Sequence, residues 1–201
     1  MSEENLSGAP ASGLRERKKQ ETLRRITEAG LKLFSTDGYE ATTLDAIAAE
    51  AGISRRTFFH YFKSKDDILL SLQRGLGETL AAAVLAQPAG KSPVETVRDA
   101  QLTLVAPYSP RELLALDRLM RSSEAVQARK QAGYVHDEAL LYDALRKRWP
   151  ERSETALRLV AMLSIGIVRL SLDVWSSSGG ERPLAEHLKE AFDALPAACD
   201  A

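Results

Sequence analysis

The chain has little cysteine: Cys199 is the single one among 201 residues. An internal disulfide is therefore excluded, and this cysteine usage favours a reducing cytoplasm. The first residues, MSEENLSGAPASG, carry two glutamates where a secretory signal would have cations, and no apolar run follows them. We expect a cytoplasmic protein in which residues 1–14 form a disordered tail.

An uninterrupted apolar run long enough to cross a membrane is also lacking. The most apolar segment, residues 156–175, contains Arg158, Arg169 and Asp173, and charges inside a membrane are costly. We expect this segment to be a buried helix of a soluble protein, with no membrane partner. Arg169 is expected to pair with Asp173 one turn on, or otherwise to anchor an anionic ligand.

Net charge is nearly absent, because 27 Lys and Arg stand against 28 Asp and Glu, for a formal charge of −1. The distribution is uneven. Residues 11–65 hold 11 Lys and Arg but 7 Asp and Glu, a surplus that the rest of the chain cancels. This asymmetry predicts a basic N-terminal module on a neutral to acidic body.

Strand patterns are missing too, since no alternating β-branched run is bounded by turn residues, and apolar residues recur every three or four positions. We therefore predict an all-α fold of two domains: 15–65, a three-helix domain, and 66–201, a larger helical domain for ligand binding and dimerisation. The predicted helices span about 16–35, 66–87, 93–105, 110–121, 123–148, 152–176 and 183–195.

Motifs of catalysis and metal binding are absent as well. His60, His136 and His187 lack the spacing of metal ligands. The chain shows no glycine-rich phosphate loop, nucleophile elbow or paired-carboxylate signature. We expect no metal, no cofactor and no enzymatic activity.

What the chain does contain is a basic, aromatic stretch, GISRRTFFHYFKSK, at residues 52–65. Thr43 is placed to cap a short helix, LDAIAAEAG, whose Gly52 supplies the turn residue, and Ser54 is placed to cap a second helix, RRTFFHYF. Two short helices joined by a glycine turn form a helix-turn-helix. We predict that this motif binds DNA.

The second helix of this motif has the residues that a major-groove helix needs. Polar and cationic side chains near its N-terminus can reach base edges, and apolar ones behind can hold it against its partner helix. Phe58 and Phe62 are predicted to pack on Ile47 and Leu33. The residues expected to face DNA are Ser54, Arg55, Arg56, Thr57, Phe59, His60, Tyr61, Lys63 and Lys65. The alternatives are a solvated basic face, or a motif that contacts protein rather than DNA.

The segment LRRITEAGLKLFSTDGYEATTLDAIAAEAGISRRTFFHYFKSKDDIL resembles the DNA-binding domain of TetR-family regulators, over about residues 15–70. The resemblance implies a homodimer that reads a palindromic operator in double-stranded DNA. It also implies a C-terminal domain that controls DNA affinity by binding a small-molecule effector. A repressor is the expected role.

By position in the family pattern, Arg55, Arg56 and Thr57 would face bases or nearby phosphates. Tyr61 and Lys65 would bind phosphates, and Thr43 would hold the N-terminus of its helix against the sugar–phosphate backbone of DNA. Two positions depart from the pattern. Phe59 replaces the usual tyrosine and so loses its hydroxyl, and Arg56 replaces a glycine or small residue and so adds charge. The basic segment LRERKK, ahead of the first predicted helix, would add DNA contacts or remain solvated.

Apolar stripes in the second domain could line an effector cavity, with core packing as the alternative for each residue. A diffuse similarity to a TetR subgroup that recognises acyl-CoA-like molecules implies an elongated apolar effector whose anionic head is held by Arg121, Arg169 or another cation. The competing effector is a planar aromatic compound stacked on Tyr134 or Tyr142. The candidate ligand-binding residues are Leu80, Leu116, Met120, Tyr134, Tyr142, Leu163, Ile167 and Arg169.

The last two predicted helices, 152–176 and 183–195, are apolar on more than one side. A chain of this size offers them one core, so the second apolar side implies a partner. We predict that they form the dimer interface.

Overall fold

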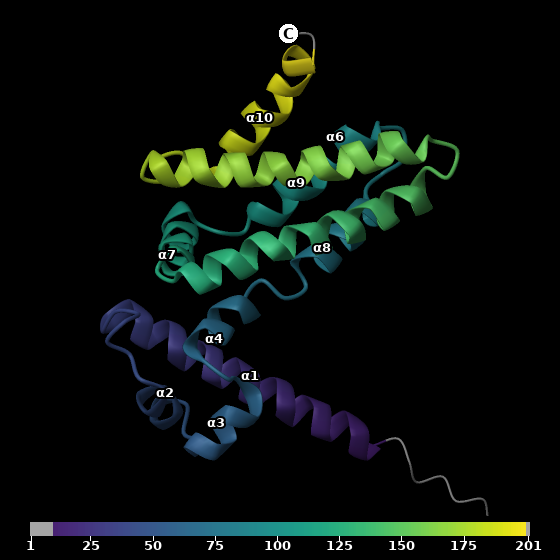
Figure 1. The fold of residues 1–201 in the computed structure, drawn as a ribbon. Coiled ribbons are helices and arrows are strands. Elements are labelled where there is room, and N and C mark those ends of the chain that lie inside the picture. The colour runs from purple at the N-terminus through teal and green to yellow at the C-terminus, as the bar shows by residue number, and fades with distance from the viewer. Residues whose placement is uncertain (1–9, 200–201) are drawn as a thin grey trace, which may run out of the picture. The chain divides into compact units, whose positions relative to one another are not determined.

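The computed structural model describes residues 10–199, which are helical with no strand among them (Figure 1). The all-α prediction is confirmed. The helices are α1 (Pro10–Thr36), α2 (Leu44–Glu50), α3 (Arg55–Tyr61), α4 (Lys65–Ser71), α5 (Leu76–Ala86), α6 (Pro93–Val105), α7 (Pro110–Arg121), α8 (Glu124–Arg148), α9 (Glu154–Ser177) and α10 (Leu184–Cys199).

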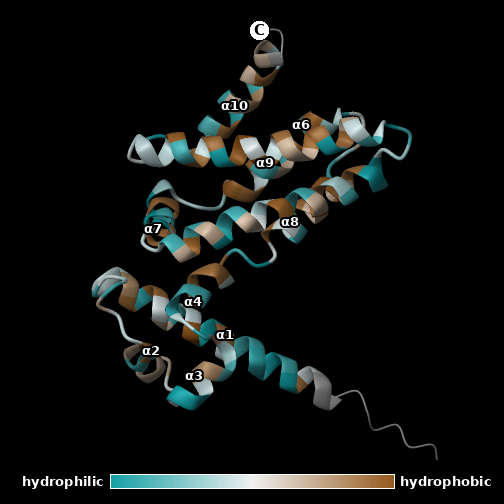
Figure 2. Cartoon of the chain, in the orientation of Figure 1, coloured by the Kyte–Doolittle hydropathy of each residue, from teal (hydrophilic) through white to brown (hydrophobic). Residues whose placement is uncertain are grey.

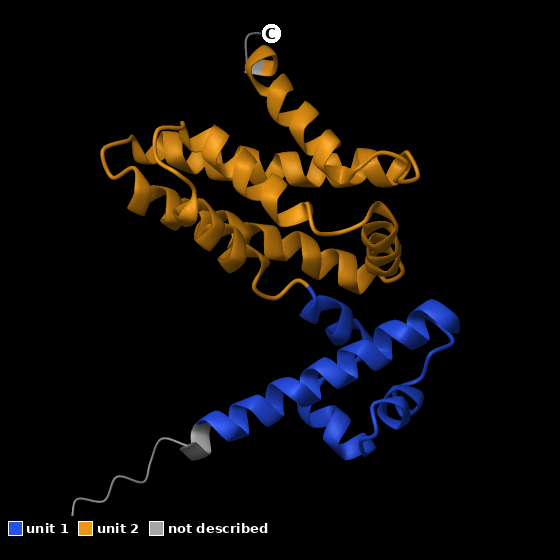
Figure 3. Cartoon of the chain, turned by 180° about the vertical axis from the view of Figure 1, so that it is seen from behind, with its two compact units in different colours: residues 1–72 blue, residues 73–201 orange. Residues whose placement is uncertain are grey.

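The chain divides into two compact units between Leu72 and Gln73, a few residues after the predicted boundary (Figure 3). Most of the predicted tail, residues 1–9, lies outside the described residues. Residues 10–14 were predicted to be disordered, and that prediction is wrong, because they belong to α1. The LRERKK segment is likewise part of this helix and does not precede it.

Unit 1 contains α1 to α4. The N-terminal half of α1 is hydrophilic (Figure 2), whereas Ile26 and Phe34 in its second half are buried against α2 and α4. The predicted caps are present: the Thr43 hydroxyl accepts from the amide of Ala46, and the Ser54 hydroxyl accepts from the amide of Thr57, both at 3.1 Å. These bonds satisfy amides that a helix start leaves without partners.

A continuous helix over 66–87 was predicted, and this prediction is wrong. α4 ends at Ser71 and α5 begins at Leu76, with a turn between them. Gly75 has a φ of +81°, a left-handed conformation that glycine adopts without steric cost. The leucine stripe repeats through the segment at helical spacing, but the two glycines of the sequence RGLG favour the break.

Unit 2 has two groups of buried residues along α9. One joins α9 to α5, α6 and α8, with Val84, Leu141 and Leu145 fully buried. The other joins α9 to α10 and includes Trp175 and Leu188. α10 runs through Pro196, which the sequence suggested as its end.

Arg148, in the last turn of α8, ties that helix to the end of α5. Its guanidinium donates to the carbonyls of Val84 and Leu85 at 3.1 Å and to the carbonyl of Pro88 at 2.6 Å. The last carbonyls of a helix lack partners within the helix, and a cation there also complements the helix dipole. Arg148 therefore caps α5 and fixes its contact with α8.

Two glycines of unit 2 predict opposite responses to the same change. A Cβ on buried Gly77 would overlap Asp137 Oδ1 and lie 2.9 Å from Leu140 Cδ1, whereas a Cβ on Gly133 meets nothing within 4 Å. We expect Gly77→Ala to lower the free energy of unfolding by roughly 1–3 kcal/mol, because α5 must move off α8. Gly133→Ala should instead raise it by about 0.5–1 kcal/mol, since alanine favours the helix. Urea unfolding followed by circular dichroism measures both, and a Gly77→Ala variant as stable as the wild type would contradict the close α5–α8 packing.

Two stretches of the described helices are long and apolar enough to cross a membrane by length and composition alone, 65–86 and 154–177. The first is interrupted by the turn before α5. In the second, 33% of the most apolar window is buried within the chain. Much of the apolar surface of α9 therefore faces outward.

Candidate nucleic-acid interface and ligand pocket

The recognition helix α3 separates its aromatic residues between two sides. Phe58 and Phe62 are 0% and 1% exposed, as the sequence predicts, while Phe59 is 44% exposed. The exposed residues of this helix and its cap, together with half-buried Thr57 and Tyr61, form the candidate DNA surface. Its exposed members are Ser54, Arg55, Arg56, Phe59 and His60.

The two arginines at the start of α3 differ in their surroundings. Arg55 forms an ion pair with Asp45 of α2 at 2.8 Å, and its guanidinium lies 5.7 Å from the centroid of the Phe59 ring. Both members of the pair are more than 60% exposed, and such pairs contribute about 0–1 kcal/mol. Within the described residues, Arg56 has no hydrogen-bond or ion-pair partner. A phosphate or base edge can therefore engage either side chain at little cost.

Lys65 is more constrained than the sequence suggested. Its ammonium donates to the carbonyls of Tyr39 at 2.6 Å and Glu40 at 3.2 Å, and it lies 4.4 Å from the centroid of the Tyr39 ring. Lysine has three N–H donors. One donor stays available for a phosphate, while the other two hold the segment before α2 in place.

Sequence reasoning missed two cations of α1 that position the helix-turn-helix. Arg25 donates to the carbonyls of Ala51 and Gly52, and Lys32 pairs with Glu50 of α2 at 2.5 Å. Gly52 has a φ of +64°, so the turn that Arg25 braces is one that favours glycine. The sequence shows that these two cations lie on the face of α1 toward α2. Helical periodicity alone does not show whether such a cation contacts a neighbouring helix or is solvated.

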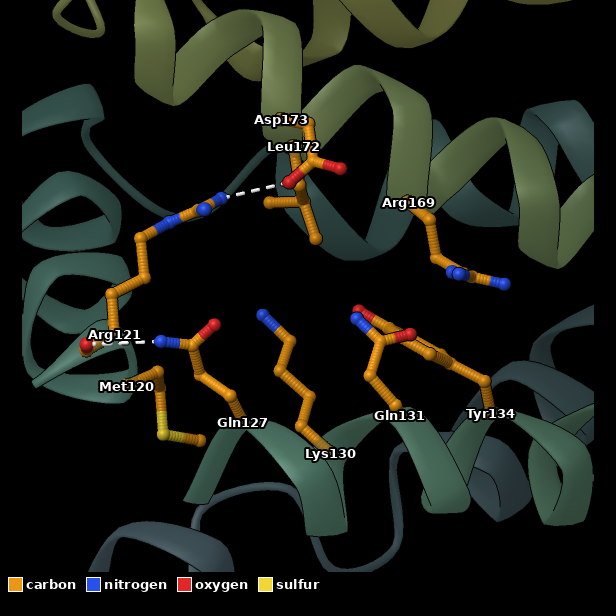
Figure 4. Close-up of a pocket in the computed structure, with 9 residues that line it drawn as sticks. All are labelled: Met120, Arg121, Gln127, Lys130, Gln131, Tyr134, Arg169, Leu172 and Asp173. Atoms are coloured by element: carbon orange, nitrogen blue, oxygen red, sulfur yellow. Dashed lines mark hydrogen bonds and ion pairs between the residues drawn. The ribbon is translucent and has the colours of Figure 1, made fainter. Parts of the chain in front are cut away.

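Unit 2 contains a small pocket between α7, α8 and α9, partly open to solvent, with a cavity volume of about 40 Å³ (Figure 4). This is well below the roughly 300–1,000 Å³ of most ligand sites. Polar and charged side chains dominate its wall. The lining residues are Met120, Arg121, Gln127, Lys130, Gln131, Tyr134, Arg169, Leu172 and Asp173.

An ion-pair network crosses one side of this pocket. Arg121 donates to Asp117 on its own helix at 2.7 Å and to Asp173 of α9 at 2.9 Å. The predicted pairing of Arg169 with Asp173 is therefore wrong. The arginine from α7 takes that carboxylate, and the Arg169 guanidinium lies over the Tyr134 ring, 5.2 Å from its centroid. Burial raises the pKa of Tyr134 to about 12, so its phenol stays neutral at pH 7.

Three of the eight candidate ligand residues line this pocket: Met120, Tyr134 and Arg169. The others lie elsewhere. Leu80 and Tyr142 are buried in the packing of α5, α8 and α9, and Ile167 is buried toward α10. Leu116 is partly buried, and Leu163 is 43% exposed. The candidate ligand residues chosen from the apolar stripes therefore lie in three places: the core, the pocket wall and an outer surface.

That outer surface is an apolar face of α9. Its large side chains are 43% to 56% exposed and recur every three or four residues, with Gly166 in the middle of the row. Monomeric proteins rarely expose contiguous apolar patches of this kind. The residues are Leu159, Met162, Leu163, Leu170 and Val174. We call this row the α9 apolar face.

Among the residues that the structure describes, no group of three or more His, Cys, Asp or Glu side chains could hold a metal ion. The polar groups that the structure brings together are three cations, two amides and one carboxylate in the pocket, and cations beside aromatic rings on α3. Their chemistry suits binding of anions and nucleic acid.

Comparison with known proteins gives the same result. The family described as bacterial regulatory proteins, tetR family, matches residues 26–72, which include the helix-turn-helix. The HTH-type transcriptional regulator TcmR of Streptomyces glaucescens is 33% identical over 105 residues, 52% of this chain and 46% of that protein. The HTH-type transcriptional repressor KstR of Rhodococcus jostii is 28% identical over 163 residues, 79% of this chain and 71% of that protein. The chain thus spans less than half of the length of TcmR.

A solved structure extends the similarity to both units. FadR of Thermus thermophilus, a TetR-family transcriptional repressor in complex with lauroyl-CoA, is 30% identical, with a TM-score of 0.57. The similarity covers 86% of this chain and 92% of that one. These relatives are transcriptional regulators and not enzymes, as the sequence predicts. With its helix-turn-helix and its helical second unit, the chain belongs to the TetR family of transcriptional regulators.

Proposed function

We propose that the protein is a cytoplasmic, homodimeric repressor that binds a palindromic operator and leaves it when a small acyl-CoA-like effector binds unit 2. The surface of α3 carries the DNA half of this proposal, because exposed cations and an exposed aromatic ring stand together at the start of a recognition helix. Repression is supported by the relatives KstR and FadR, which are named as repressors.

The proposed DNA contacts follow from the positions of the side chains on unit 1. Arg55 and Arg56 would reach base edges, where arginine pairs with guanine through two hydrogen bonds. Ser54 and Thr57 would contact bases or phosphates in the same turn. The sugar–phosphate backbone would be contacted by Thr43, Phe59, His60, Tyr61, Lys63 and Lys65. Four exposed cations in the first half of α1 add positive charge for the flanking phosphates: Arg15, Arg17, Lys18 and Lys19.

Dimerisation is proposed through the α9 apolar face. Its five large side chains gain burial when a second copy covers them, and Gly166 lets the two helices approach closely because no atom lies within 4 Å of its Cβ position. α10 contributes less, since its exposed Glu186 and Glu190 form ion pairs with Arg182, which lies just before the helix. A two-fold axis would set the two recognition helices about 34–36 Å apart, one turn of DNA.

A gel shift on the upstream region of the protein's own gene tests the proposal. We expect retention that exceeds retention of random DNA of equal length, with affinity that falls steeply as salt rises. Adding lauroyl-CoA should release the protein from the operator. Equal, weak retention of both DNAs would favour the alternative, a helix-turn-helix that contacts protein.

Arg56→Ala is the sharpest variant for base recognition, because within the described residues Arg56 has no hydrogen bond or ion pair that the change would break. We expect a loss of roughly 1–3 kcal/mol in operator affinity and a relaxed preference at one position of each half-site. Lys63→Ala is the matched control, since it removes an exposed cation near the other end of α3. It should weaken all sequences alike and lower the salt slope by about one. If Arg56→Ala lowers the affinity for operator and for random DNA equally, Arg56 does not recognise a base.

A further inference from the structure

The pocket of unit 2 has more cations than carboxylates around it. Arg121, Lys130 and Arg169 lie on or beside it with two carboxylates, Asp117 and Asp173. Both carboxylates bind Arg121 through hydrogen bonds of 2.7 and 2.9 Å. Arg121 therefore uses its donors to hold α7 against α9, and it is a poor candidate for binding an effector.

Lys130 is the most buried of the three cations. Its side chain is 17% exposed, and the nearest carboxylate oxygen, on Asp117, lies 3.9 Å away, beyond hydrogen-bond distance. Among the described residues no acceptor bonds its ammonium. Burial lowers the pKa of Lys130, which reflects the cost of a charged group without partners. Figure 4 shows its nitrogen pointing into the pocket.

Arg169 faces the same space from α9. No carboxylate pairs with it among the described residues, and its guanidinium rests on the ring of Tyr134. An arginine held in this way keeps its N–H donors free for a planar oxyanion. The Tyr134 phenol is protonated at pH 7, and burial raises its pKa further, so it can add an O–H donor.

We propose that Lys130 and Arg169 together bind the anionic group of the effector, a carboxylate or phosphate, while Met120 and Leu172 contact the start of its apolar body. This inference rests on the proposed function and narrows it. The oxyanion supplies the acceptors that the ion-pair network does not offer to these two cations. Lys130 escaped the sequence analysis, because a lysine in the middle of a polar helix is ordinarily solvated.

The test uses full-length protein, isothermal titration calorimetry and three probes: lauroyl-CoA, laurate and the neutral n-dodecanol. Binding of laurate would assign the site to a carboxylate, and binding of lauroyl-CoA alone would assign it to the CoA phosphates. Lys130→Gln and Arg169→Gln should each weaken binding of the anionic probe at least tenfold and leave any binding of n-dodecanol unchanged. Lys130→Arg should restore most of the affinity, which a merely structural role would not predict.

Matched controls lie on the same helices. Lys147→Gln on α8 and Arg158→Gln on α9 remove exposed cations outside the pocket, and both should bind the probes like the wild type. The inference is overturned if Lys130→Gln and Arg169→Gln also bind like the wild type, or if neither anionic probe binds at all. Calorimetry uses the protein without DNA and tests only effector binding. The gel shift tests DNA binding, so failure of the inference and failure of the proposed function can be told apart.

Discussion

Met162→Glu on the α9 apolar face should convert the protein into a monomer and remove tight operator binding. Met162 is 54% exposed and lies in the middle of the row, so a second copy that covers this face would bury it. A glutamate there would lose its hydration without gaining a partner, and its symmetry mate would bring a like charge close to it. Two linked half-site contacts bind far more tightly than one, so operator affinity should fall by roughly 10²–10⁴-fold.

Light scattering at micromolar concentration measures the mass, and a gel shift measures the affinity. Val135→Glu is the matched control, because Val135 is a large apolar residue of α8 that is 68% exposed and lies outside the row. It should leave both the dimer and DNA binding unchanged. A wild type that is already monomeric, or a Met162→Glu variant that stays dimeric, would exclude the α9 apolar face as the interface.

The local elements of unit 1 could be predicted because each depends on few residues. A cap at Thr43, a glycine at the turn and a cap at Ser54 define α2 and α3 whatever the rest of the chain does. The bracing of that turn by Arg25 could not be predicted, since it joins residues 26 positions apart. Periodicity gives the face on which a side chain lies but not what lies opposite it.

The pocket was harder to predict for the same reason. Apolar stripes indicated a cavity lined by Leu80, Tyr142 and Ile167, yet close packing uses these residues to fill the space between helices. What remains open is lined by polar side chains that would cost free energy to bury. The Arg169–Asp173 pair looked favourable along one helix, but Arg121 reaches the same carboxylate from another helix. Spacing within one helix cannot decide between such competitors.

Trp175→Ala should be the most destabilising single change in unit 2. Trp175 lies near the end of α9 and is fully buried. Its indole Nε1 donates to the carbonyl of Arg182 at 2.8 Å, and its ring lies close to Gly180 and Leu114. The side chain thus joins α9, the turn before α10 and α7. Truncation leaves a cavity and removes the hydrogen bond, so we expect a loss of roughly 3–5 kcal/mol in the free energy of unfolding.

Two further variants separate packing from hydrogen bonding at this position. Trp175→Phe keeps most of the ring contacts and loses the N–H donor, so its loss should be closer to about 1 kcal/mol. Trp149→Ala is the control, because Trp149 is partly exposed and should cost less than Trp175→Ala. Urea unfolding at one fixed protein concentration measures all three, since dimerisation makes stability depend on concentration. Equal losses for Trp175→Ala and Trp149→Ala would contradict a central role for Trp175.

If Trp175→Ala loses more free energy of unfolding than Trp149→Ala, it should also weaken the dimer. The Trp175 side chain holds α10 against the helix that carries the α9 apolar face.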